Sequence, residues 1–173
     1  SGLYDLNGHT IIPRSNMTLL GEGIDRTIIR LFPTKHASIG MAIECAIELE
    51  SYIENFNAEN FTLIQNVEPV NHHGGLVLGG ESKNIVIRNI KVTDVSGAAI
   101  SVHDYNNILI ENNIVERTWT GIVAVNGTDA VIRGNTIDNA AGDGILLIYS
   151  AQNLTIENNY LGHIGDTAID VSG

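Results

Sequence analysis

The sequence is poor in basic residues. Only nine of its 173 residues are Lys or Arg, against twenty Asp or Glu, so the formal net charge is −11, and no basic residue follows Arg133. Nucleic-acid binding depends on Lys and Arg to neutralise phosphates, so this balance argues against a nucleic-acid partner. An acidic surface that keeps the chain in solution is the simpler interpretation.

Cysteine and long apolar runs are also scarce. The single cysteine, Cys45, cannot form an internal disulfide, and its alternation with Ile43, Ile47 and Leu49 predicts a small buried side chain rather than a nucleophile. No apolar run approaches the roughly 20 residues of a membrane span, and the chain does not open as a signal peptide does. We therefore expect no membrane span. The missing signal leaves the compartment open, because a signal can be removed.

Hydrophobic residues and glycine, by contrast, are plentiful. Hydrophobic residues make up 43% of the chain, and 18 glycines stand against three prolines. This composition argues against disorder and predicts one domain over residues 1–173, with a sizeable core and many tight turns.

One pattern of alternating apolar residues, closed by asparagine or glycine, repeats along the chain. Four copies are "KNIVIRNIKV" from Lys83, "NNILIENNIV" from Asn106, "TDAVIRGNTI" from Thr128 and "QNLTIENNYL" from Gln152. A fifth, "ENFTLIQNVE" from Glu59, fits with one shift of pattern. The polar residue that opens each strand recurs at nearly constant intervals, as Asn60, Asn84, Asn107, Asp129 and Asn153.

A second strand keeps phase with the first. It includes Val102, Val125, Ile148 and Val171, which are equally spaced along the chain. No helical period separates the strands, so a crossover helix is excluded and the chain must wind, stacking parallel strands about 4.8 Å apart. The predicted fold class is all-β, a single-stranded parallel β-helix of about 22–24 residues per coil.

In a solenoid of this kind, each column of the repeat becomes a stack of side chains. The two predicted interior columns are Ile87, Ile110, Ile132 and Ile156, and beside them Ile85, Ile108, Ala130 and Leu154. The outward column alternates in sign from coil to coil, as Arg88, Glu111, Arg133 and Glu157, which favours a single register.

The asparagines that interrupt the strands are predicted to turn corners. Asn89, Asn112, Gly134 and Asn158 fall on one turn, where asparagine tolerates the left-handed conformation. An amide there can bond to the coils above and below. We expect Asn112 in particular to be interior or half-buried and to make such bonds.

The repeats, together with "SNMTLLGEGIDRTIIRL" at residues 15–31, resemble the right-handed parallel β-helix of the pectate-lyase-like superfamily. The resemblance covers nearly the whole chain and implies a right-handed solenoid. It does not select one activity, because polysaccharide lyases, glycosidases, epimerases, phage tailspikes and adhesins share this fold.

Within that superfamily the layout is most similar to the catalytic modules of mannuronan C5-epimerases. In "SGAAISVHDY", His103 and Asp104 fall where that family has His and Glu, whereas Ser101 and Val102 replace its Asp and Pro. The coil above has Val125 where that family has a further acidic residue. The resemblance therefore implies a site without the family's full set of carboxylates.

The candidate site is the column that runs from His103 through the coils above it. We expect His103 to lie below Asn126, Tyr149 and Ser172, so that a histidine and a tyrosine about 10 Å apart flank a sugar ring as acid and base. The candidate catalytic residues are His103, Asp104 and Tyr149. The candidate substrate-binding residues are Ser101, Asn126 and Tyr149. The alternative is a polar rim with no ligand.

Two other groups could bind a metal. Asp143 in "AGDGI" and Asp166 in "IGDTAI" lie one coil apart, so they could share calcium or act as a carboxylate pair, or they could simply form turns before a strand. His72 and His73 lack a second ligand cluster nearby, so no metal site is assigned to them.

Two functions therefore remain open. One is an extracellular or surface domain that binds or processes a polysaccharide as a lyase, C5-epimerase or glycoside hydrolase. The other is a structural rod of a phage tailspike, surface layer or adhesin. In either case we expect a segment of a longer β-helix or larger protein, or end-to-end association through uncapped coil ends.

Overall fold

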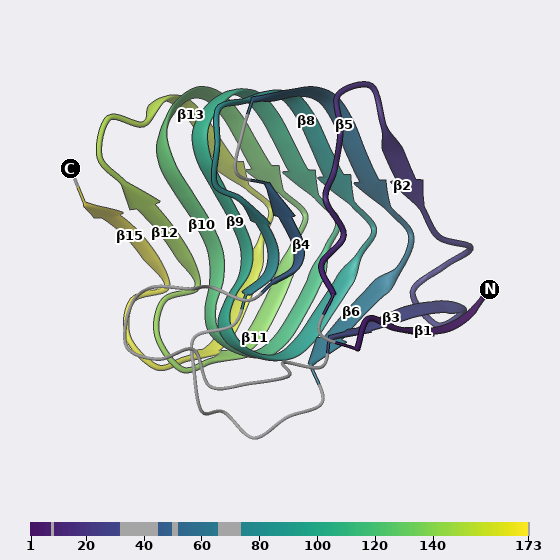
Figure 1. Ribbon diagram of the computed structural model, residues 1–173. Coiled ribbons are helices and arrows are strands. Elements are labelled where there is room, and N and C mark those ends of the chain that lie inside the picture. The colour runs from purple at the N-terminus through teal and green to yellow at the C-terminus, as the bar shows by residue number, and fades with distance from the viewer. Residues whose placement is uncertain (8, 32–44, 50–51, 66–73, 173) are drawn as a thin grey trace, which may run out of the picture.

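The computed structural model describes residues 1–7, 9–31, 45–49, 52–65 and 74–172, and these form a solenoid of parallel strands (Figure 1). No helix occurs in these residues, and so none that could span a membrane. Three faces, which we name A, B and C, follow one another along the coils. Their strands are stacked side by side along the solenoid.

Face A consists of β2 (Thr18–Leu20), β5 (Ile53–Glu59), β8 (Ser82–Arg88), β13 (Gln152–Glu157) and the ends of β9 and β10. Face B consists of β1 (Gly2–Asp5), β3 (Thr27–Leu31), β6 (Thr62–Gln65), β11 (Thr136–Ala140), β14 (Tyr160–Ile164) and the starts of β9 and β10. Face C consists of β4 (Cys45–Leu49), β7 (Gly74–Leu78), β12 (Ile145–Ile148), β15 (Ile169–Ser172) and the middle of β9 and β10. The long strands β9 (Lys91–Glu111) and β10 (Ile114–Arg133) each pass through all three faces.

The core fills the inside of the solenoid, as the alternation predicted. Ile87 pairs with Ile110, Ile110 with Ile132, and Ile132 with Ile156. Ile87, Ile110 and Ile132 are at most 1% exposed, and Ile156 is partly buried. The column of Ile85, Ile108, Ala130 and Leu154 is likewise in register. The predicted burial of Cys45 falls on a side chain outside the described ones.

The charged column on the outside of face A also has the predicted register. Arg88 pairs with Glu111 and Arg133 with Glu111, and Arg133 Nη2 lies 2.8 Å from Glu111 Oε2. Arg88 Nε lies 3.0 Å from Glu59 Oε2 of the preceding coil. Each of these arginines pairs with acidic residues of both neighbouring coils, so this column favours the observed register.

Two of the residue correspondences that the repeat predicted between coils are wrong. Asn55, not Asn60, corresponds to Asn84, because β5 pairs with β8 through Asn57 and Val86. On face C, Val102 pairs with Ala124 rather than Val125. The second error has a local cause. The register between β9 and β10 shifts between Thr118 and Thr120. The coil is one residue shorter there, so the residues of β10 on face C lie one position earlier than the equal spacing predicted.

The buried asparagine ladder lies at the corner between faces A and B, one residue after the predicted position. Asn113, 1% exposed, accepts a hydrogen bond from Ile90 N at 3.1 Å and donates to Ile87 O and Asn135 Oδ1, both at 3.0 Å. Asn135 makes the corresponding bonds to Ile110 O and to Asn159 of the next coil. These amides satisfy backbone groups that the turn leaves without strand partners.

Asn112 has a different role from the one predicted. It is exposed, and its φ of 54° gives the left-handed turn that carries the chain into the ladder position. Asn89, Gly134 and Asn158 have the same conformation one coil apart, so the prediction of a left-handed corner is confirmed. The prediction that Asn112 is interior and bonded to neighbouring coils is wrong, because the left-handed residue points its side chain outward while the next residue points inward.

We expect Asn113→Leu to destabilise the fold strongly. The leucine would leave Ile90 N–H and Ile87 C=O buried without partners, at about 1–3 kcal/mol for each group. Asn112→Gly is the matched control, because glycine adopts positive φ freely and Asn112 makes no ladder bond. Urea unfolding should show a large loss for the first variant and little change for the second. Equal losses would contradict the assignment of the ladder to Asn113.

Candidate functional site

The candidate site lies where face C turns into face A, along the upper edge of the solenoid in Figure 1. Asp104, Asn126 and Tyr149 occupy this corner in successive coils, with φ of 45°, 51° and 62°. A left-handed residue bends the strand sharply and turns its side chain outward, which explains why one polar group per coil emerges here.

Ser101 and His103 lie just before the corner, on the outer side of β9. Val102 between them is fully buried in the core, so its two neighbours point the other way. Ser101 Oγ lies 2.8 Å from His103 Nε2, and Ser101 is only 5% exposed. Burial lowers the pKa of His103, against the smaller opposing effect of the Asp104 carboxylate. The lowered pKa favours the neutral imidazole, and Ser101 Oγ and His103 Nε2 share a hydrogen bond.

The predicted stack of His103 below Asn126 and Tyr149 is not what the structure contains. His103 pairs with Val125, Val125 with Ile148, and Ile148 with Ser172. Asn126 and Tyr149 instead follow those residues and share the corner with Asp104. The cause is again the shortened coil of β10, visible in the sequence as the shorter interval between Asn107 and Asp129.

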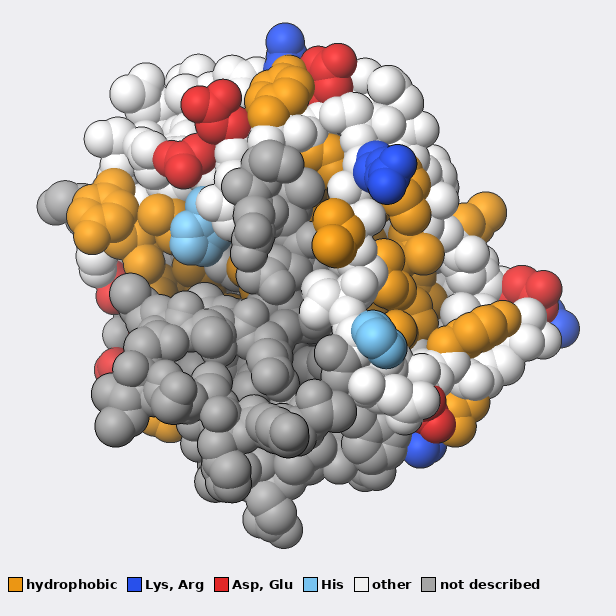
Figure 2. Space-filling view, in the orientation of Figure 1, with side chains coloured by type: hydrophobic (Ala, Val, Ile, Leu, Met, Phe, Trp, Pro, Cys, Tyr) orange, Lys and Arg blue, Asp and Glu red, His pale blue; other side chains and the backbone are white. Residues whose placement is uncertain are grey.

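A pocket of about 320 Å³ opens at this corner. It is lined by Tyr52, Glu81, Ser82, Lys83, Asp104, Asn106 and Asn126, and we name it the corner pocket. Figure 2 shows acidic and basic side chains gathered along the same upper edge. The pocket thus combines carboxylates, an ammonium, amides and one aromatic ring.

Hydrogen bonds hold several of these groups in place. The Asn126 amide donates to Asp104 Oδ1, and Asn106 donates to Thr128 Oγ1 at 3.0 Å. Tyr52 donates to Glu54 at 2.8 Å. That bond, with the charges of Glu54 and Glu81, raises the pKa of Tyr52. Oriented groups lose less entropy when a ligand binds.

Two charged residues of the corner pocket remain available. Lys83 and Glu81 have no ion-pair partner in the described part of the chain. Both come from the coil before His103, where β8 pairs with β9 through Ser82 and Tyr105 and through Lys83 and Asn106. Sequence reasoning missed them, together with Tyr52 and Ser82, because it followed the coils above His103 and not the coil below.

The structure therefore unites some of the predicted site residues and separates others. Asp104 and Asn126 share the pocket, and Ser101 contacts His103. Neither His103 nor Tyr149 lines the pocket, and Tyr149 is 70% exposed on the corner one coil beyond Asn126. Lys83 supplies a cation that the sequence did not suggest.

Asp143 and Asp166 lie in the turns between faces B and C, where the Asp143 carboxylate and the Asp166 backbone N–H make local hydrogen bonds. Asp143 Oδ1 accepts a hydrogen bond from Thr167 N at 3.2 Å, and Asp166 N donates to Gly142 O at 3.2 Å. Both residues thus order the turns between faces B and C. Among the described side chains, no cluster of three or more His, Cys, Asp or Glu is arranged to hold a metal ion. His72 and His73 lie outside the described residues.

Comparison with known proteins confirms the expected fold family. Residues 50–173 match the family model described as "Right handed beta helix region". This chain belongs to that right-handed β-helix family. No curated protein matches the sequence. Among solved structures it is similar to the A-module of the Azotobacter vinelandii mannuronan C-5 epimerase AlgE6, at 16% identity and a TM-score of 0.43. That likeness covers 93% of this chain and 47% of the other, so the chain spans about half the length of that structure.

We predict that His103 makes stability depend on pH. Its pKa in the fold is below the unfolded value of about 6.5, so the unfolded chain binds more protons just below that pH. The stability that the neutral ring contributes is present above about pH 6.5 and is lost as the pH falls below it. His103→Gln should remove this component. Urea unfolding at a series of pH values should show a shallower acid loss in the variant; parallel profiles would contradict the prediction.

Proposed function

We propose that this β-helix is an extracellular or surface-exposed domain that binds an oligosaccharide portion of a polysaccharide in the corner pocket. The observation that carries the proposal is the lining of that pocket. A single depression presents carboxylates, an ammonium and amides beside a tyrosine ring.

The chemistry of these groups suits a sugar. Sugar hydroxyls need both acceptors and donors, which Glu81 and Asp104 supply as carboxylates and Lys83 and Asn106 as N–H groups. Tyr52, 53% exposed, offers an apolar ring face against which the C–H face of a pyranose can pack. Such pockets bind by a few placed polar groups around an apolar surface.

Tyr149 and the pair of Ser101 and His103 extend this surface on either side. Tyr149 continues the corner column toward later coils, and its exposed ring can contact a further sugar unit. His103, with Ser101, flanks the pocket on face C. In this proposal Ser101, Asn126 and Tyr149 bind substrate, as the sequence suggested.

We propose binding without turnover. Proton abstraction beside a uronate needs a base, an acid on the opposite face and a group that neutralises the carboxylate. Lys83 could serve the last role, and His103, Asp104 and Tyr149 are the candidates for the others. His103 and Tyr149 lie outside the pocket that Lys83 lines, however, so the three functions do not converge on one sugar ring.

The binding proposal predicts that Tyr52→Ala and Lys83→Ala weaken glycan binding by about tenfold each, the equivalent of about 1.4 kcal/mol. Tyr160→Ala and Lys91→Ala are matched controls, because both side chains lie on face B. A glycan array identifies the ligand, and calorimetry then compares the four variants. Equal losses in the controls would show that binding lies elsewhere. No binding to any glycan would favour the structural rod, associated through its coil ends.

The absence of turnover is tested separately. Alginate and pectin fragments incubated with the domain should give neither ultraviolet absorbance from unsaturated products nor C5 inversion in proton NMR spectra. Turnover that disappears in His103→Ala but persists in Tyr160→Ala would overturn this part of the proposal and make the site that of a lyase or epimerase.

A further inference from the structure

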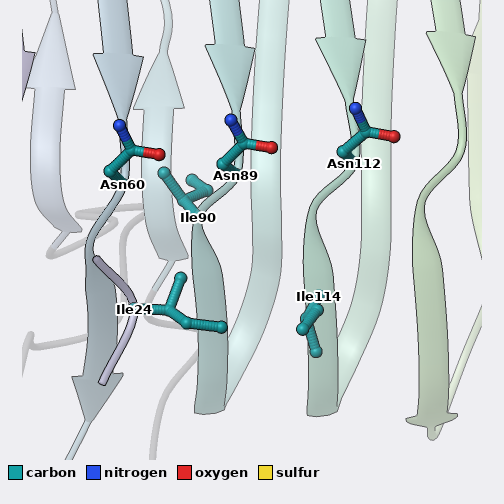
Figure 3. A pocket seen from close by; sticks show the side chains of 6 residues that line it. All are labelled: Ile24, Asn60, Asn89, Ile90, Asn112 and Ile114. Atoms are coloured by element: carbon teal, nitrogen blue, oxygen red, sulfur yellow. The ribbon is translucent and has the colours of Figure 1, made fainter.

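A second depression lies at the opposite corner, where face A turns into face B. Its volume is about 220 Å³, and it is lined by Ile24, Asn60, Asn89, Ile90, Asn112 and Ile114. We name it the amide groove. Figure 3 shows the three asparagines on neighbouring strands with their side chains oriented alike, above the three isoleucines.

The amides of this groove are free to bind a ligand. In the described part of the chain, no hydrogen bond involves the side chains of Asn60, Asn89 or Asn112. The corner between faces C and A behaves differently. There Asn55 donates to Asn16, Asn84 to Asn55 and Asn107 to Asn84, at 2.8 to 3.0 Å, so those amides satisfy one another. Two outward-facing columns of left-handed asparagines thus differ in whether they are paired.

One end of the groove is built rigidly. The loop that carries Ile24 is held by hydrogen bonds from Gly23 N to Asn60 O at 2.9 Å and from Thr62 Oγ1 to Ile24 O. Gly21 permits this close approach, because a Cβ there would lie 2.1 Å from Asn60 O. Ile24 therefore forms a fixed end wall, and binding requires little ordering of the protein.

The other end of the groove is open. The next residue of the column is Gly134, which has no side chain to continue the amide row. A Cβ at Gly134 would lie 2.5 Å from Asn112 Oδ1, so any larger residue there would displace the last amide of the row. The groove thus accommodates a chain that extends past Gly134.

The lining identifies the class of ligand. No charged side chain lines the groove, so it offers nothing to compensate a charged ligand. Each amide is both donor and acceptor. Below the amides, Ile24 and Ile114 are partly exposed and offer apolar contacts, whereas Ile90 between them is fully buried. The amides recur at the coil spacing of about 4.8 Å. The residues of an extended peptide recur at a shorter distance and soon fall out of step with that spacing. One unit of a linear 1,4-linked pyranose chain, by contrast, has nearly the length of one coil.

We propose that the amide groove binds the end of a linear neutral oligosaccharide, with edge hydroxyls on the amides and C–H faces on Ile24 and Ile114. The row spans two coil steps, about 10 Å, which corresponds to two or three sugar units. This site is separate from the corner pocket and depends on different residues, so either can exist without the other.

The test uses titration of the isotope-labelled domain with cello-, xylo- and chito-oligosaccharides. In nitrogen-proton NMR spectra, the side-chain NH₂ signals of Asn60, Asn89 and Asn112 should shift and saturate, while that of Asn84 stays in place. Asn89→Gly and Asn112→Gly, which copy the natural Gly134, should each weaken binding about fivefold, as expected for the loss of one or two hydrogen bonds.

Asn158→Gly is the matched control, because Asn158 has the same left-handed conformation but does not line the groove. It should bind as the parent does. The proposal is overturned if the three signals do not move at millimolar oligosaccharide, if Asn158→Gly weakens binding equally, or if an uncharged extended peptide produces the same shifts.

Discussion

The structure depends on hydrogen bonding between the backbones of successive coils. Every described strand pairing is parallel, and the long strands β9 and β10 are paired through all three faces of their coils. Parallel stacking requires each residue to lie over its equivalent in the next coil, so a residue type chosen once per repeat becomes a continuous column. The apolar columns of the core, the alternating charges of face A and the asparagine corners all follow from this one constraint.

The corners are where the constraint is hardest to satisfy. A coil with three faces must turn sharply, and the turn removes some N–H and C=O groups from the strand ladder. The ladder of Asn113, Asn135 and Asn159 satisfies those groups from inside, while left-handed residues make the turn itself. Two asparagines in succession, as at Asn112 and Asn113, therefore have different structural roles. The first sets the backbone conformation and the second bonds to the backbone of the neighbouring coils.

The same geometry explains why the candidate sites lie at corners. Strand residues that point inward pack in the core, and those that point outward on the faces pack beside equivalent residues of neighbouring coils. A left-handed corner residue packs in neither place, so its side chain projects outward in every coil. Asp104 and Asn126 at one corner, and Asn60 and Asn89 at another, gain their functional potential in this way. The coil spacing then sets the distance between neighbouring groups.

The sequence by itself determined the solenoid, the interior isoleucine columns and the left-handed corners, because these depend on patterns that recur once in every coil. It did not determine which individual residues pair between neighbouring coils. A single shortened coil in β10 moved Asn126 away from His103 and beside Asp104, and the choice between Asn112 and Asn113 for the buried ladder depended on which side of the turn each residue faces. Lys83, Tyr52 and the pairing of Ser101 with His103 likewise became visible only in the folded chain. Pockets form between coils, from residues far apart in sequence, and their membership depends on side-chain directions that only tertiary packing decides.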